Sequence, residues 1–209
     1  MYISPEKLKQ KLNKPLPGLS SHLKMAPASR VAEIRNIEIY YENARKSAVM
    51  LLLFQENNNT KVIFIRRSFY VGIHAGQIAF PGGRYEESDL TIENTALREI
   101  EEEIGIKGDK IEIIGRLSDI YVPPSNFLIS IFVGYLKEKP IYNIDKREVD
   151  EVIEIDLDDF FRENVIQEKD FTVPPSDTTI NALCYNVGNI HLWGASAMVM
   201  TEFLDILRG

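Results

Sequence analysis

Residues 91–106 read TIENTALREIEEEIGI and carry a clear helical pattern. Apolar side chains recur there at the spacing of one helix face, so a helix is expected from Thr91 to Ile104. Asp89 or Thr91 suits the N-cap position, because a short oxygen-bearing side chain can accept a hydrogen bond from a free backbone N–H. Gly105 is placed as the stop, since glycine readily adopts the left-handed conformation that ends many helices.

The polar side of this helix concentrates carboxylates on one stripe. At about 100° per residue, Glu99, Glu102 and Glu103 project within an arc of about 100° beside the apolar face. Like charges three and four residues apart repel each other, and the negative end of the helix dipole adds to the cost. Arg98 can reach Glu102, but one arginine cannot neutralise the group. The stripe therefore predicts either a site for Mg²⁺ or Mn²⁺, which take oxygen ligands, or a solvated acidic face.

The segment before the helix favours the metal site. Residues 80–83 read FPGG, and glycines let the backbone approach a ligand closely and expose its carbonyls. Gly83 together with residues 98–106, REIEEEIGI, resembles the Nudix box, Gly-x5-Glu-x7-Arg-Glu-U-x-Glu-Glu-x-Gly-U with U aliphatic. Every defined position agrees from Arg98 onward. Asp89 stands where glutamate is usual, and eight residues rather than seven separate it from Arg98.

Segments outside the box resemble the coenzyme A diphosphatase branch of the Nudix hydrolases. The loop that leads from Arg67 to Gly83 is similar to the motif associated with coenzyme A recognition, and the longer front half of the box is also a feature of that branch. Residues 15–27 and 192–197 are similar to the branch as well. Ile65 and Gly72 depart from it, because threonine and arginine are usual at those positions, and the missing arginine removes a phosphate contact.

The resemblance implies one Nudix hydrolase domain over residues 1–209, with an N-terminal extension at 1–30 and the box at 83–106. The implied fold is an α/β/α sandwich with a mixed sheet and a catalytic loop-helix-loop. The sequence pattern agrees, because strand-like and helix-like segments are interleaved without a regular βα repeat. Strands are expected at 48–54, 62–65, 111–122, 127–136, 149–155 and 181–187, and further helices at 5–12, 157–162 and 195–207.

The resemblance also implies hydrolysis of a diphosphate that joins a nucleoside to another group. Coenzyme A would give 3′,5′-ADP and 4′-phosphopantetheine, with Mg²⁺ or Mn²⁺ neutralising the phosphates. Arg98 would orient the glutamates. Glu148 would supply a further metal ligand or the general base, or else is an exposed acid before a strand. The implied metal ligands are Glu99, Glu102, Glu103 and the Gly83 carbonyl; the catalytic residues are Glu102, Glu103, Glu148 and Arg98; the substrate-binding residues are Arg67, Ser68, His74, Gln77 and Arg84.

Composition narrows the class of protein. The 209 residues are 44% hydrophobic and 26% charged, which is ordinary for a globular domain. The net charge of −7 equals the charge of residues 86–103 alone, so no basic nucleic-acid footprint remains. Cys184 is the single cysteine, which suits a reducing compartment, and no apolar run approaches the roughly 20 residues of a membrane span. A cytoplasmic protein with a nucleotide-type substrate is expected, away from membranes, and homodimer formation is left open.

Three functions remain at this point. The first is hydrolysis of coenzyme A or its thioesters, and the second is hydrolysis of another nucleoside diphosphate derivative such as ADP-ribose or NADH. The third is nucleotide sensing without turnover, which the intact glutamates of the box disfavour. Two roles also stay open: His74 either fixes its loop or acts on substrate, and Trp193 either packs against the last helix or stacks on an adenine.

Overall fold

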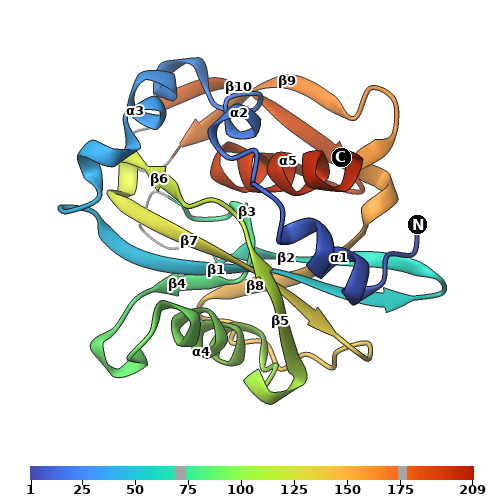
Figure 1. Ribbon diagram of the computed structural model, residues 1–209. Coiled ribbons are helices and arrows are strands. Elements are labelled where there is room, and N and C mark those ends of the chain that lie inside the picture. The colour runs from blue at the N-terminus through green and yellow to red at the C-terminus, as the bar shows by residue number, and fades with distance from the viewer. Residues whose placement is uncertain (69–73, 174–177) are drawn as a thin grey trace.

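The computed structural model describes residues 1–68, 74–173 and 178–209. Within these ranges, an eight-stranded mixed sheet lies between helix α4 on one face and helix α5 on the other, which is the expected sandwich (Figure 1). A second sheet of three antiparallel strands packs on the α5 side. None of the helices in these ranges is both long and apolar enough to cross a membrane.

The helices and strands have the following bounds. The helices are α1 (Pro5–Leu12), α2 (Leu19–His22), α3 (Val31–Arg35), α4 (Ile92–Ile104) and α5 (Gly194–Arg208). The strands of the large sheet are β1 (Arg45–Glu56), β2 (Asn59–Arg67), β3 (Ile78–Ala79), β4 (Gly82–Arg84), β5 (Ile111–Arg116), β6 (Ile120–Val122), β7 (Phe127–Leu136) and β8 (Val149–Asp156). The small sheet contains β9 (Ile166–Val173), β10 (Thr178–Val187) and β11 (Ile190–Trp193).

Strands β1 and β2, both expected from the sequence, form a hairpin in the middle of the large sheet, with Leu52 opposite Ile63. Asn57 and Asn58 make the turn with φ values of 51° and 64°, a left-handed conformation that asparagine tolerates better than most residues. On its other side β1 runs parallel to β7. The sheet is therefore mixed, as the sequence predicts.

Alternation along β1 divides the core into two halves. Leu51 and Leu53 belong to the apolar cluster that contains α5, whereas Met50 and Leu52 belong to the cluster that contains Ile100 of α4. All of these side chains are fully buried. The long apolar run in β1 is thus explained by helices on both faces of the sheet.

Helix α4 begins and ends as predicted from the sequence. The Thr91 hydroxyl accepts the N–H of Asn94 at 3.2 Å, and Gly105 ends the helix with a φ of 75°. Asp89 lies just before this helix, and its carboxylate accepts the N–H of Glu86 at 2.9 Å in the preceding 3₁₀ turn. Of the two N-cap candidates, Thr91 is the one that caps α4.

The remaining elements follow the sequence with a few differences. The strand expected at 111–122 is divided into β5 and β6, which pair with opposite ends of β7. The pairing of β5 is irregular between Ile113 and Gly115, and the chain leaves the ladder soon afterwards. The sequence does not predict β9, whose side chains are mostly exposed, or the four-residue β11. Residues 157–161 form a 3₁₀ helix where a short helix is expected.

A buried carboxylate ties the N-terminal segment to α5. Glu202 is fully buried and accepts the N–H of Gly18 at 3.1 Å and the hydroxyl of Ser118 at 2.6 Å. His22 Nε2 lies 2.9 Å from the same carboxylate. Burial would raise the pKa of Glu202, but the hydrogen bonds from His22 and Ser118 hold this pKa below its ordinary value. This network fixes the N-terminal segment on the body of the domain.

Candidate active site

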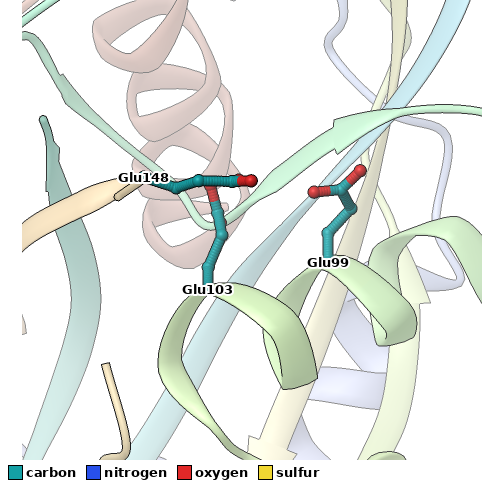
Figure 2. Close-up of side chains that lie close together, drawn as sticks. All are labelled: Glu99, Glu103 and Glu148. Atoms are coloured by element: carbon teal, nitrogen blue, oxygen red, sulfur yellow. The ribbon is translucent and has the colours of Figure 1, made fainter. Parts of the chain in front are cut away.

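Three carboxylates from two distant parts of the chain meet beside α4 (Figure 2). Glu99 and Glu103 rise from successive turns of α4, and Glu148 reaches toward them from the residue before β8. Each carboxylate offers one oxygen, and these oxygens lie within 4.8 Å of one another. Such a group of oxygens is compatible with the coordination shell of a hard divalent cation.

The carboxylate of Glu103 is enclosed and has few partners. Its Oε2 accepts the N–H of Gly82 at 2.8 Å, and its Oε1 lies 3.3 Å from Nη1 of Arg67. Burial raises the pKa of Glu103 to about 8, although Arg67 and the Gly82 N–H favour the ionised form; Glu99 and Glu148 add repulsion. This carboxylate therefore binds a proton more readily than an exposed glutamate, and a cation would relieve its charge.

Gly83 leaves the space that Glu99 occupies. A Cβ at Gly83 would lie 2.5 Å from the carboxylate carbon and both oxygens of Glu99. Glu99 is 9% exposed, and burial raises its pKa while the neighbouring Arg98 lowers it. The predicted site residue Gly83 thus adjoins the cluster of carboxylates, and any side chain at this position would displace the carboxylate of Glu99.

Arg98 braces the start of α4 and the carboxylates. Its Nε donates to Asp89 at 2.7 Å, its Nη2 to the Arg84 carbonyl at 2.9 Å, and its Nη1 to Glu102 at 2.7 Å. Nη2 also lies 3.0 Å from Glu99. The hydrogen bonds from Arg98 hold the pKa of buried Asp89 at about 2. All three guanidinium nitrogens are engaged by the protein, which fits the orienting role predicted for Arg98.

Glu102 lies apart from the three converging carboxylates. Its side chain is 57% exposed and paired with Arg98 one turn earlier. On the helix, Glu102 is about 100° from Glu103, so the arginine on its own side is the nearer partner. The role of Glu102 as a metal ligand stays a prediction.

A cleft of about 390 Å³ opens beside these carboxylates, within the range of roughly 300–1,000 Å³ usual for ligand sites. Four of the five predicted substrate-binding residues line it: Arg67, His74, Gln77 and Arg84. Ser68 is not among the lining residues. Nδ1 of His74 lies 3.0 Å from Oε1 of Gln77, and burial lowers the pKa of His74. A neutral His74 that holds its neighbour fits the loop-fixing role.

The segments that resemble the coenzyme A branch converge on this cleft. The cleft is lined by Pro27 of the N-terminal segment, by the loop residues already named, by Trp193 at the end of β11 and by Ser196 in the first turn of α5. The Trp193 ring stacks on Phe171 of β9, with ring centroids 4.4 Å apart and planes 6° apart. The sequence does not predict this partner for Trp193, because Phe171 lies in a strand without a clear apolar pattern.

The floor of the cleft crosses four neighbouring strands. Arg84 of β4 is opposite Ser47 of β1, Ser47 is beside Ile129 of β7, and Ile129 is opposite Ile120 of β6; all four residues line the cleft. Neighbouring strands lie about 4.8 Å apart, so Ile120 is roughly 14 Å from Arg84. The cleft has a charged end at β4 and an aliphatic end at β6, where α3 and α5 contact the strand and the lining side chains include Ile34, Ile120, Val122, Pro123 and Val199; Arg30, one turn before Ile34, also lines the cleft.

The two departures from the branch pattern lie in different places. Ile65 is fully buried in the apolar cluster on the α4 face and does not line the cleft. Gly72 lies outside the described residues.

The sequence could have indicated the aliphatic end of the cleft, because Ile120 and Val122 are two residues apart and therefore face the same side of a strand.

The fold and the site together define a class of protein, an α/β/α domain with an acidic site built on a loop-helix-loop segment and completed by Glu148. Residues 44–174 match the family model of the NUDIX domain. The chain belongs to the Nudix hydrolase family.

Individual relatives agree at modest identity. A protein of Caenorhabditis elegans named Nudix hydrolase 3 is 29% identical over 175 residues, which cover 77% of this chain and 72% of that protein. The Nudix hydrolase NudL of Photorhabdus laumondii is 34% identical over 116 residues, 56% of this chain and 61% of the relative, so the match spans less than two thirds of NudL. The crystal structure of a MutT/nudix family protein from Enterococcus faecalis superposes with a TM-score of 0.54 at 15% identity, covering 100% of this chain and 76% of that one, and shares the fold.

Proposed function

We propose that the protein hydrolyses the diphosphate linkage of a nucleoside diphosphate derivative with the help of Mg²⁺ or Mn²⁺. One observation carries this proposal: the carboxylates of Glu99, Glu103 and Glu148 converge directly behind Gly82 and Gly83, which line the cleft. Arg67 lines the cleft and also faces Glu103, and Gly83 lines the cleft and packs on Glu99. A diphosphate held in the cleft is therefore close to the carboxylates.

The donor set fits a hard divalent cation. Carboxylate oxygens are the ligands that Mg²⁺ and Mn²⁺ prefer, and burial raises the pKa of both Glu99 and Glu103. Glu99, Glu103 and Glu148 would hold the metal, with Glu102 and the Gly83 carbonyl as further ligands. When bound, such an ion neutralises diphosphate charge and makes water more acidic.

Residues of the chain would also bind the diphosphate, orient the carboxylates and accept a proton. Arg67 and Arg84 bring positive charge to the cleft and favour a bound diphosphate. Arg98 holds Glu99 in place. Glu148 is exposed; one of its oxygens would bind the metal, and we assign to the other oxygen the role of accepting the proton of the attacking water. The water oxygen bonds to one phosphorus, the bridging P–O bond breaks, and the leaving phosphate keeps the bridging oxygen.

Coenzyme A or an acyl-coenzyme A is the substrate we propose, giving 3′,5′-ADP and 4′-phosphopantetheine or its acyl form. The resemblance of the cleft-lining segments supports this choice. The aliphatic end, roughly 14 Å from Arg84 by strand spacing, supports it as well. Between its two amides and its hydroxyl, the pantetheine arm carries methyl and methylene groups and ends in a thiol. These apolar groups suit the aliphatic end better than the second sugar of ADP-ribose or NADH, which carries a hydroxyl on neighbouring carbons and few apolar groups to bury.

The test is chromatography of coenzyme A, acetyl-coenzyme A, ADP-ribose and NADH after incubation with the protein and Mg²⁺ or Mn²⁺. We expect 3′,5′-ADP from the first two compounds. Glu103→Gln should lower the rate more than about 100-fold, beyond the usual effect of residues that only support a metal ligand. Glu101→Gln changes an exposed residue of the same helix and should keep the wild-type rate.

The other outcomes separate the alternatives. Cleavage of ADP-ribose or NADH with coenzyme A intact would replace the proposed substrate and retain the diphosphate chemistry. If every compound survives while Mn²⁺ binds, nucleotide sensing without turnover becomes the leading hypothesis. A Glu102→Gln variant with weaker Mn²⁺ binding would support Glu102 as a ligand.

A further inference from the structure

The loop that carries Glu148 is attached to the end of α4. The N–H of Asn143 donates to the carbonyl of Ile104 at 3.0 Å, and the N–H of Asp145 donates to the carbonyl of Glu103 at 3.1 Å. The last carbonyls of a helix lack partners within the helix, so they are free to accept these bonds. The loop is thus hydrogen-bonded to the helix that carries two of the three carboxylates.

Gly105 allows this close approach. A Cβ on Gly105 would lie 2.6 Å from Cβ, 2.8 Å from the carbonyl oxygen and 2.9 Å from the backbone nitrogen of Asn143. Two of those three atoms are backbone and cannot rotate away. The residue that ends α4 therefore also sets how closely the loop can approach the helix.

Ser68 attaches the same loop to the end of β2. Its N–H donates to the carbonyl of Glu148 at 2.9 Å, and its hydroxyl donates to the carbonyl of Lys146 at 3.1 Å. Ser68 thus holds both ends of the tripeptide 146–148. The preceding residue, Arg67, is the one that faces Glu103.

We propose that Ser68 is a positioning residue that sets where the Glu148 carboxylate lies relative to Glu99 and Glu103, and that it does not contact substrate. The inference rests on the proposed function. Glu99 and Glu103 are fixed by their helix and by burial, whereas Glu148 is exposed and depends on the backbone of its loop. Ser68 holds that backbone and is not among the residues that line the cleft.

The test is a double-mutant cycle with Ser68→Ala, Glu148→Gln and the double variant. For each variant we would measure kcat, KM and the dissociation constant of Mn²⁺, the last by electron paramagnetic resonance without substrate. Ser68→Ala should lower kcat and weaken Mn²⁺ binding by about 10-fold each, at the lower end of the range for residues that orient metal ligands. KM should stay within about twofold. In the Glu148→Gln background, Ser68→Ala should have no further effect, because both changes act through one carboxylate.

Ser20→Ala is the matched control, because its hydroxyl also donates to a backbone carbonyl, that of Pro17 at 2.8 Å. This control should leave every measured quantity unchanged. Independent, multiplying losses from Ser68→Ala and Glu148→Gln would overturn the inference, as would a rise in KM alone or no change in Ser68→Ala. A Glu148→Gln variant with unchanged kcat and Mn²⁺ binding would overturn the inference too. The proposed function is tested separately, by the loss of activity expected in Glu103→Gln. If no compound is hydrolysed, the proposed activity fails and the Mn²⁺ measurements alone decide the positioning role.

Discussion

Replacing Glu103 with glutamine in the metal-free protein is expected to flatten the pH dependence of the free energy of unfolding. Glu103 is fully buried, and its pKa rises from 4.5 to about 8. In this pH window the folded protein keeps the proton, whereas the unfolded chain releases it. Stability should therefore be highest near the acid end of the window and fall as the pH rises through it.

The size of this fall follows from the two pKa values. A tenfold difference in proton affinity corresponds to about 1.4 kcal/mol, so the whole window amounts to at most roughly 5 kcal/mol. Water entry and small shifts of the side chain reduce this figure, and we expect about 2–4 kcal/mol between pH 5 and 8. Such a change is a large fraction of the roughly 5–15 kcal/mol that stabilises a typical domain.

The assay is urea unfolding at several pH values in the presence of a chelator, for wild type, Glu103→Gln and Glu101→Gln. The slope with pH is the readout, because glutamine also disturbs the contacts with Gly82 and Arg67 and so changes the absolute stability. Glu101→Gln, the exposed control, should keep the wild-type slope. Excess Mn²⁺ should restore the stability of wild type at pH 8, by about 2.7 kcal/mol at 100 times its dissociation constant. An unchanged slope in Glu103→Gln would refute the reasoning.

Three other substitutions test neighbouring parts of the structure. Gly83→Ala should weaken Mn²⁺ binding at least about 10-fold, as measured by titration, since the added Cβ would lie 2.5 Å from the Glu99 carboxylate. Asp89→Asn should lower the free energy of unfolding at pH 7 by about 1–3 kcal/mol in urea, because it weakens a buried partner of Arg98. The same variant should lose part of the acid unfolding of wild type, since the low pKa of Asp89 stabilises the fold above pH 3.8 and that gain disappears as the pH falls toward 2. Glu202→Gln should lower the free energy of unfolding by about 1.5–3 kcal/mol, because the buried Glu202 carboxylate accepts several hydrogen bonds. The readout is a lower Tm with KM unchanged, since Glu202 belongs to α5, on the face of the sheet opposite α4.

The sequence predicts α4 well because the signals that define it are local. Thr91 and Gly105 act on backbone groups within one turn, so a cap and a stop can be recognised without knowing the rest of the fold. The helical stripe also identifies Glu99 and Glu103 correctly as neighbours. The same stripe includes Glu102, yet the observed partner of Glu102 is Arg98. Helical periodicity predicts the direction in which a side chain points, but it does not predict which of several possible partners the side chain contacts.

Long-range pairing limits what the sequence can predict elsewhere. The break between β5 and β6 depends on their shared partner β7, which no pattern within 111–122 contains. Strand β9 is missed because nearly all of its side chains are exposed, so apolar alternation is absent. The contact of Ser68 with the Glu148 loop is made through backbone carbonyls, and backbone acceptors leave no trace in side-chain identity.

The cluster of three carboxylates includes one residue from outside α4 for a geometric reason. Residues one turn apart, such as Glu99 and Glu103, point the same way, so one helix can supply two converging carboxylates but leaves the opposite side open. Glu148 fills that side, and its loop is bound to the last carbonyls of the same helix. The same loop is also bound to Ser68 at the end of β2, so the position of Glu148 relative to Glu99 and Glu103 depends on both α4 and β2. Arg67, the last residue of β2, faces Glu103, and Ser68, which follows it, holds the Glu148 loop, so the end of β2 fixes the third carboxylate against the two that α4 carries.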